Sequence, residues 1–145
     1  MNTRMSATRR TQQREIRMTI RNEAAYMRNL WDWACLDGCM GARKQCVSDV
    51  DGIVERNGQF LVIETKSTGT PVPMGQSIMF SSFARLPQFR VLVVWGKPGH
   101  VTHMQRWGGS IHEATTEDFR DTVREWWKRV NRMPRPSAIN RGNNR

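Results

Sequence analysis

Two runs of hydrophobic and polar residues typical of β-strands lie within residues 48–67, and they are separated by Asn57 and Gly58. An Asn-Gly pair between two β-rich runs is the strongest short-range signal for a β-hairpin with a two-residue turn. A type I′ turn at these two residues places Arg56 directly opposite Gln59. The sequence therefore predicts an antiparallel hairpin whose register follows from the turn.

The predicted register brings four charged side chains together on one face of the hairpin. Counting outward from the turn, Asp51 faces Glu64 and Asp49 faces Lys66. Side chains alternate between the two faces of a strand, so these four project from the same side. The opposite side, where we expect a core, carries the apolar residues Val50, Val54, Leu61 and Ile63.

Helical periodicity marks three further segments. From about Gln12 to Ala34, apolar residues recur with the spacing of one helix face. Residues 74–86 are predicted to form a short helix that ends before Pro87. A last helix is predicted to begin at Thr115 or Thr116, with the apolar stripe Phe119, Val123, Trp126 and Val130. Trp127 falls off that stripe, which leaves it either exposed for a stacking or dimer contact or partly buried.

Two more strands are predicted between these helices. Residues 90–96 include the continuous apolar run Val91–Trp95, which is typical of a strand buried on both faces. Residues 101–107 alternate weakly, as an edge strand would, and 44–47 are predicted to begin the first strand. The order of elements predicts an α/β fold, with a mixed central sheet of four to five strands flanked by helices.

Two carboxylates directly opposite each other on one sheet face repel, so Asp51 and Glu64 require an explanation. A divalent cation provides one, because oxygen ligands at that separation suit Mg²⁺ or Mn²⁺. Lys66 could then orient a water or stabilise charge on a phosphate. The simpler alternative is a surface hairpin with an Asp49–Lys66 ion pair, worth under about 1 kcal/mol. It leaves Asp51 and Glu64 unexplained, so we favour the metal site.

These residues resemble the motif of the PD-(D/E)xK, or restriction-endonuclease-like, nuclease superfamily, which includes small phage nucleases and archaeal-type Holliday junction resolvases. Glu64-Thr65-Lys66 follows Asp51 by thirteen residues, after an apolar strand. Val50 stands where the motif has proline. Gly75-Gln76 resembles the glutamine that several of these families place after the motif. The resemblance covers roughly residues 15–107.

The resemblance implies a restriction-endonuclease-like core and a phage- or prophage-encoded, metal-dependent DNA endonuclease that acts as a homodimer, with branched DNA as a candidate substrate. Asp51 and Glu64 would hold Mg²⁺ or Mn²⁺ with the Thr65 carbonyl, and Lys66 would position the attacking water. Gln76 would join the site or be a solvated residue at a helix start. Glu23 is a candidate outer ligand or an exposed partner of an arginine, and Asp49 is a candidate accessory ligand.

The net charge of +10 is concentrated at the two ends of the chain. Residues 1–30 contain seven Arg and two Glu, and 128–145 contain six basic residues and no acidic one, whereas 31–127 contain ten basic and eleven acidic residues. Basic ends on a near-neutral body fit a polyanion such as DNA. The candidate phosphate-binding residues are Arg9, Arg10, Arg14, Arg17, Arg135 and Arg141.

The remaining features of the sequence concern the cellular compartment and the domain organisation. Cys35, Cys39 and Cys46 are expected to be reduced, cytoplasmic thiols that are buried as small hydrophobes rather than bound to zinc. We expect a basic mobile arm at 1–11, a nuclease-like domain at 12–132 and a basic disordered tail at 133–145. The alternative function is a nuclease-fold module that binds nucleic acid without cutting it.

Overall fold

The computed structural model describes residues 32–41 and 45–137. Its contacts divide the chain into two compact units, residues 1–47 and 48–145, which are considered separately. In the first unit, the described part holds a short 3-10 helix, η1 (Ala34–Leu36). The predicted arm at 1–11 and residues 12–31 of the predicted helix lie outside the described residues, and Asp32 and Trp33, at the predicted end of that helix, are not helical.

The second unit is built on the predicted hairpin, whose register is confirmed. Strands β1 (Gly52–Arg56) and β2 (Gln59–Lys66) pair antiparallel, with Arg56 opposite Gln59. Asn57 and Gly58 have φ values of 51° and 76°, the positive angles that a type I′ turn requires at both central residues. The Asn-Gly signal therefore identified both the turn and the alignment of the strands.

The hairpin is shorter than predicted at the end opposite the turn. Residues 45–51 form no strand, so the prediction that β1 begins at 44–47 is wrong for the part that the structure describes. The register would bring Val50 opposite Thr65, but the Thr65 N–H donates to Oδ2 of Asp51 at 2.8 Å. Because a side chain takes this donor, the backbone ladder ends at Gly52 and Ile63.

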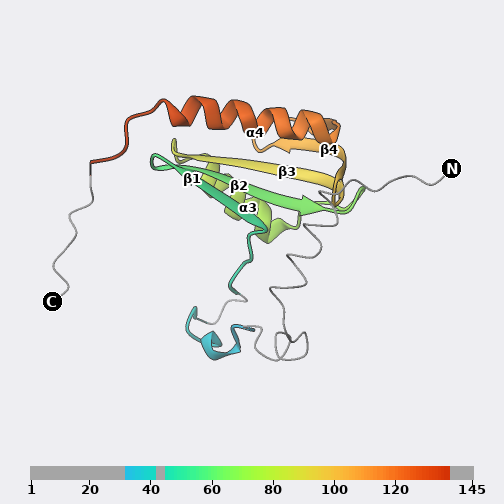
Figure 1. Ribbon diagram of the computed structural model, residues 1–145. Coiled ribbons are helices and arrows are strands. Elements are labelled where there is room, and N and C mark those ends of the chain that lie inside the picture. Colours follow the sequence, from blue (N-terminus) through green and yellow to red (C-terminus); the bar gives the residue numbers. More distant parts are fainter. Residues whose placement is uncertain (1–31, 42–44, 138–145) are drawn as a thin grey trace, which may run out of the picture. The chain divides into compact units, whose positions relative to one another are not determined.

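The hairpin belongs to a five-stranded mixed sheet with the order β1-β2-β3-β4-β5, flanked by two helices (Figure 1). Helix α3 (Met74–Ala84) connects β2 to the parallel strand β3 (Phe89–Lys97), and the other strand pairs are antiparallel. Strands β4 (His100–Arg106) and β5 (His112–Glu113) and helix α4 (Thr116–Asn131) complete the unit. The predicted α/β class and strand number are confirmed.

Strand β4 was expected at the edge of the sheet, and this expectation is wrong. The two-residue strand β5 pairs with it, opposite His103 and Met104. The sheet edges in the described part of the chain are therefore β1 and β5. A strand of two residues carries no readable alternation, so periodicity could not reveal it.

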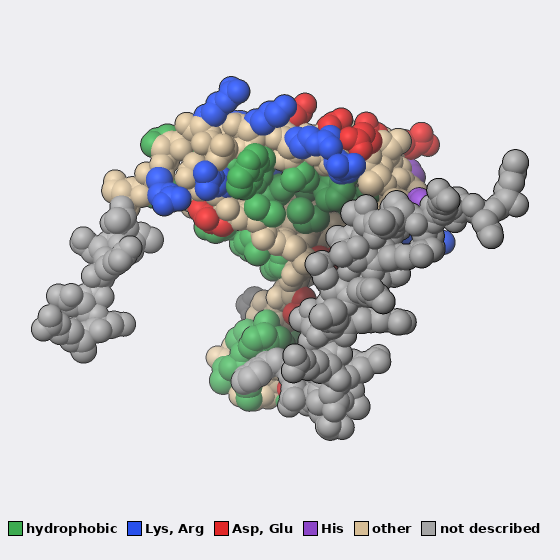
Figure 2. Space-filling view, viewed as in Figure 1, with side chains coloured by type: hydrophobic (Ala, Val, Ile, Leu, Met, Phe, Trp, Pro, Cys, Tyr) green, Lys and Arg blue, Asp and Glu red, His purple; other side chains and the backbone are tan. Residues whose placement is uncertain are grey.

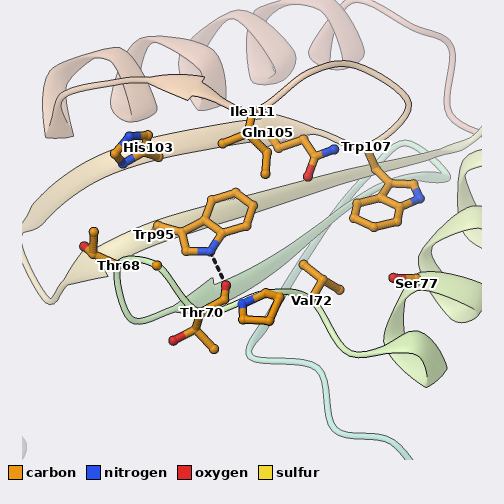
Figure 3. Close-up of a pocket in the computed structure, with 11 residues that line it drawn as sticks. Thr68, Thr70, Val72, Ser77, Trp95, His103, Gln105, Trp107 and Ile111 are labelled. Carbon is orange, nitrogen blue, oxygen red and sulfur yellow. Dashed lines mark hydrogen bonds between the residues drawn. The ribbon is translucent and has the colours of Figure 1, made fainter.

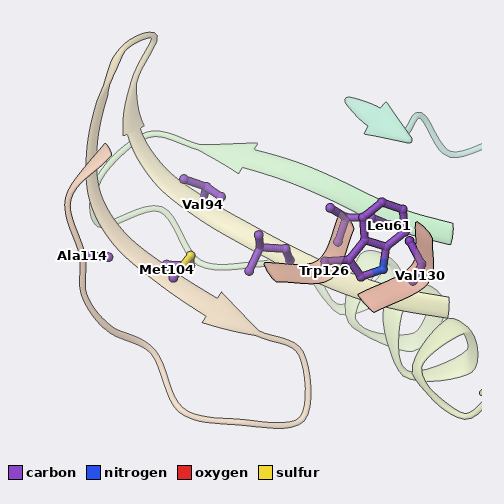
Figure 4. Packing of buried hydrophobic residues seen from close by; sticks show 7 residues of the cluster. Leu61, Val94, Met104, Ala114, Trp126 and Val130 are labelled. Carbon is purple, nitrogen blue, oxygen red and sulfur yellow. The ribbon is translucent and has the colours of Figure 1, made fainter. Parts of the chain in front are cut away.

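Each face of the sheet packs against one helix, and β3 contributes to both cores, as predicted. The core under α4 is shown in Figure 4 and contains Leu61, Leu92, Val94, Met104, Ala114, Trp126 and Val130. The core under α3 contains Val62, Phe80, Val91, Val93 and Trp95. Val54, Leu61 and Ile63 share the α4 face as expected, but Val50 packs in the α3 core, because it precedes the strand and escapes its alternation.

Helix α4 matches its prediction closely. The Thr115 hydroxyl accepts from the Asp118 N–H, and the Asp118 carboxylate accepts from the Thr115 N–H, which forms a capping box. The predicted stripe faces the sheet, with Trp126 and Val130 buried. Trp127 is 42% exposed, and the Arg56 guanidinium lies 5.3 Å from its ring centroid. The off-stripe tryptophan is therefore partly exposed and contacts a cation.

The three cysteines are free and exposed, so the expectation that they are buried is wrong. Cys35 lies in η1, where no described residue is buried. Among the described residues no helix is long and apolar enough to cross a membrane.

Two glycines provide a matched test of this backbone. Gly96 has a φ of 143° at a bulge, and a Cβ there would meet the His100 carbonyl oxygen at 2.1 Å. Gly75 lies in the first turn of α3, and a Cβ there would meet nothing within 4 Å. We expect Gly96→Ala to destabilise the protein by about 1–3 kcal/mol, and Gly75→Ala to stabilise it by up to about 1 kcal/mol. Urea unfolding measures both values, and a neutral Gly96→Ala would contradict the backbone described here.

Candidate active site

The candidate site begins at the C-terminal end of β2, where Glu64 and Lys66 project from the α3 face of the sheet. Residues two apart on a strand share a face, and the neighbour of Glu64 on that face is the buried Val62. Nζ of Lys66 lies 2.7 Å from Oε1 of Glu64, and these side chains are only 15% and 5% exposed. A carboxylate and an ammonium are thus held together largely away from water.

Helix α3 brings a third group to the same oxygen. Gln76 is the third residue of the helix, and its Nε2 donates to Oε1 of Glu64 at 2.8 Å. The prediction that Gln76 lies near a helix start is confirmed, and the structure also brings its side chain to Glu64. The reading of Gln76 as a solvated surface residue is therefore wrong.

Two oxygen atoms of this cluster are buried without a hydrogen bond. Oε2 of Glu64 and Oε1 of Gln76 have no hydrogen-bond partner in the described part of the chain. Buried polar atoms are nearly always satisfied, and a carboxylate oxygen left alone is costly. The cluster therefore has the capacity to bind a further ligand through two acceptor oxygens.

Asp51 is held beside the cluster by Thr65, the residue between Glu64 and Lys66. Oδ2 of Asp51 accepts from the Thr65 hydroxyl at 2.7 Å and from the Thr65 N–H at 2.8 Å. These bonds, first that of the hydroxyl and then that of the amide, hold the pKa of Asp51 below its usual range, and the nearby Lys66 charge lowers it further. Asp51 is thus kept ionised, and its Oδ1 is left without a hydrogen bond among the described residues.

The structure corrects two details of the predicted site. Asp51 is not paired with Glu64 in the ladder, because the strand ends at Gly52 and the carboxylate bonds to Thr65 instead. Asp49 is exposed and has no ion pair with Lys66, whose partner is Glu64. Both predictions extrapolated the register past the point where a side chain replaces the backbone partner.

The other predicted residues lie mostly beyond the described ranges. These are the candidate ligand Glu23 and the candidate phosphate-binding residues Arg9, Arg10, Arg14, Arg17 and Arg141. Arg135 is described and exposed.

The donor set suits a hard, partly hydrated cation. No group of three or more His, Cys, Asp or Glu residues able to hold a metal occurs among the residues that the structure describes. Mg²⁺ does not need such a cage, because it keeps several waters and uses one or two carboxylates. Asp51 and Glu64 supply two carboxylates, and Glu64 has a free oxygen. The described residues therefore suit Mg²⁺ or Mn²⁺, which keep several water ligands, better than a metal ion whose ligands all come from the protein.

Sequence reasoning missed two features near the sheet. The first is a cavity of about 500 Å³ walled partly by Trp95 and Trp107. The second is a cluster of Arg90, Arg106 and Arg129 that lines a smaller hollow on the α4 side. Burial lowers the pKa of Arg90 to about 10, and the two neighbouring arginines lower it too. Both groupings join residues from separate strands, and no local pattern marks them.

The surface charge over α4 is also segregated. Figure 2 shows acidic side chains gathered toward the N-terminal half of α4 and Lys and Arg side chains toward its C-terminal half. This distribution complements the helix dipole at both ends.

Comparison of the chain with protein-family models, with curated proteins and with solved structures found no match.

The bond between Thr65 and Asp51 can be tested directly. Thr65→Val removes the hydroxyl donor and keeps the amide donor, so the pKa of Asp51 should rise part of the way toward 3.8. The bonds to ionised Asp51 stabilise the fold above pH 3.8, and this contribution is lost as the pH falls through the lower folded pKa. An NMR titration of the Asp51 carboxyl carbon measures the shift.

Thr122→Val provides the control, because the Thr122 hydroxyl donates to a backbone carbonyl in α4. It should leave the Asp51 titration unchanged. An unaltered Asp51 pKa in Thr65→Val would show that the hydroxyl does not hold the carboxylate.

Proposed function

We propose that the protein is a metal-dependent DNA endonuclease that hydrolyses phosphodiester bonds. The observation that carries the proposal is the buried Glu64 carboxylate, which binds Lys66 and Gln76 through one oxygen and has no partner on the other. Asp51, which Thr65 holds by two hydrogen bonds, has a lowered pKa and lies close enough to Lys66 for its charge to contribute. Membership of the PD-(D/E)xK superfamily remains part of this proposal and rests on Asp51 and Glu64-Thr65-Lys66.

The proposed reaction assigns a role to each described group. Asp51 and Glu64 would hold Mg²⁺ or Mn²⁺, together with the Thr65 carbonyl. Once bound, the metal would supply Lewis-acid chemistry to the phosphate and lower the pKa of a water. Lys66 orients the attacking water and stabilises the negative charge that develops on the phosphate. The oxygen of the water bonds to phosphorus as the bond from phosphorus to the leaving oxygen breaks. The attacking water gives up one proton to solvent, and the leaving oxygen takes up one proton from solvent.

Gln76 positions the other groups in this proposal. Its amide N–H₂ and the Lys66 ammonium share the same oxygen of Glu64, so they restrict the rotation of the carboxylate. The second oxygen is thereby directed away from both donors and is available to a ligand. Preorganisation of this kind is what a catalytic site requires of its supporting residues.

The homodimer stays a prediction of the resemblance, since cutting two strands usually takes two sites related by a two-fold axis. Of the two sheet edges among the described residues, β1 carries an exposed apolar side chain suited to such a contact, Ile53, which is 59% exposed. The alternative, a module that binds nucleic acid without cleaving it, would leave the buried Glu64 oxygen without a purpose.

Cleavage assays on single variants test the chemistry. Asp51→Ala, Glu64→Ala and Lys66→Ala should each lower the rate of DNA cleavage in Mg²⁺ at least about 100-fold, because each removes a group that contacts the metal or the phosphate. Labelled duplex, branched and single-stranded DNA, with and without EDTA, give the readout.

Glu113→Ala and Lys97→Ala are matched controls, because both residues are exposed and make no contact with Glu64. They should cleave at the native rate. Full activity of Glu64→Ala would overturn the assigned site, and metal-independent binding without any cleavage by the native protein would favour the binding module.

The basic C-terminus should contribute to DNA affinity and not to chemistry. Removal of residues 138–145 takes away Arg141 and Arg145 and keeps Pro136, which lies against Gly58. If both arginines contact phosphates, the slope of log affinity against log salt should decrease by about 1.8 on duplex DNA. Fluorescence anisotropy across a salt series measures the slope. An unchanged slope would show that this segment does not bind DNA.

A further inference from the structure

Two tryptophans near the candidate site, Trp95 and Trp107, line a cavity of about 500 Å³ (Figure 3). On one side runs the loop that follows Lys66, with Thr70 and Val72 labelled in the view. On the other side, side chains of β3 and β4 project from the sheet, among them Trp95 and Gln105. The loop that connects the ExK strand to α3 therefore forms one wall of the cavity.

The register of the sheet places this cavity on the same face as Glu64 and Lys66. Lys66 is paired with Trp95, and Trp95 is paired with His103. Neighbouring strands lie about 4.8 Å apart, so Lys66, Trp95 and His103 form a row that spans roughly 10 Å. Paired residues share a face, which makes the floor of the cavity a direct continuation of the surface that carries Lys66.

A parallel row leads from the carboxylate. Glu64 is paired with Val93, and Val93 with Gln105, another residue of the cavity wall. Ser77, which follows Gln76 in α3, lines the cavity as well. The cavity thus adjoins the candidate site: strands β3 and β4 continue the sheet from β2, and helix α3 supplies Gln76 to the site and Ser77 to the cavity.

The indole rings in the cavity are fixed by hydrogen bonds at their edges. Nε1 of Trp95 donates to the Thr70 carbonyl at 2.7 Å, and Nε1 of Trp107 donates to the Ser81 hydroxyl at 3.1 Å. Both indole N–H groups are therefore hydrogen-bonded within the protein. What Trp107, the half-buried ring of the two, offers a ligand is apolar aromatic surface held in one orientation.

Two polar groups in the wall keep unused hydrogen-bonding capacity. Gln105 donates its Nε2 to the Gly109 carbonyl at 2.9 Å, which leaves Oε1 without a partner among the described residues. Nδ1 of His103 contacts the Thr102 hydroxyl at 3.1 Å, and the other ring nitrogen, Nε2, has no hydrogen-bond partner among the described residues. A planar ligand with donors and acceptors along its edge would match this combination of aromatic wall and polar rim.

We propose that the cavity binds one unpaired nucleobase of the DNA that the protein cleaves. A base is planar, stacks on indole rings and carries donors and acceptors on its edge. It reaches such a cavity only when it is outside the duplex stack. Trp95 lies one strand spacing from Lys66, and His103 lies two. These distances are comparable with the distance between the base and the phosphate of one nucleotide.

This inference rests on the proposed nuclease function and narrows it. The substrate would be DNA with an unpaired nucleotide beside the cleaved bond, as in a flap, a bulge or a single strand. The net charge of +10 favours a polyanionic ligand over an uncharged metabolite or peptide of similar shape.

The test compares two DNA duplexes that differ in one group, using the native protein in EDTA so that no cleavage occurs. One duplex carries a single unpaired 2-aminopurine, and the other carries an abasic residue at the same position. We expect the base-containing duplex to bind roughly 5- to 150-fold more tightly, the range that stacking of one base provides. The 2-aminopurine fluorescence should be quenched on binding. Equal affinities without quenching would overturn the inference.

Protein variants assign the effect to the cavity. His103→Ala removes part of the wall and should reduce the affinity ratio of the two duplexes, whereas His100→Ala, which changes an exposed histidine of the same strand outside the cavity, should keep it. A ratio unchanged in His103→Ala would count against this site.

If neither duplex nor any other DNA binds, the proposed function itself fails, whereas equal binding of both duplexes removes only the nucleobase cavity.

Discussion

The buried carboxylate of Glu64 is the constraint on which the arrangement of the second unit depends. Glu64 is 4% exposed, on a sheet face that α3 covers. A buried charge is tolerated only with a partner of opposite charge and with hydrogen bonds, and Lys66 and Gln76 provide both at one oxygen. The parallel crossover through α3 is what brings Gln76 back to the strand. Burial of Glu64 therefore depends on Lys66 in the same strand, on Gln76 at the start of α3 and on the crossover that connects them.

The hairpin that presents this site is secured at both ends. At the turn, Nδ2 of Asn57 donates to the carbonyls of Val130 and Met133, so the hairpin is attached to the C-terminal end of α4. At the other end, Asp51 accepts both donors of Thr65. Because each end is tied by more than one hydrogen bond, the strand between them has little freedom to slip in register. The metal site that we propose joins Glu64 of β2 to Asp51, the residue before β1, and requires that rigidity.

The sequence was most informative where structure is set by near neighbours. Asn57-Gly58 fixed the turn and the register, and the stripe of α4 fixed the face that it buries. Prediction failed where distant residues decide. Asp51 replaced a backbone partner and ended the ladder early, and Val50 moved to the opposite core as a result. The aromatic cavity depends on the crossover, which no local pattern encodes; the contact of Gln76 with Glu64 also depends on it and was anticipated only through the family resemblance.

We propose that Glu64 and Asp51 form a divalent cation site, and calorimetric titration of the native protein with Mn²⁺ is the sharpest test of that site. Glu64→Gln keeps the size and most hydrogen bonds of the side chain while it removes the charge. The account predicts that the native protein binds Mn²⁺ and that Glu64→Gln binds it at least about tenfold more weakly. Equal Mn²⁺ affinity in the two proteins would contradict the account, because the metal would then be held elsewhere.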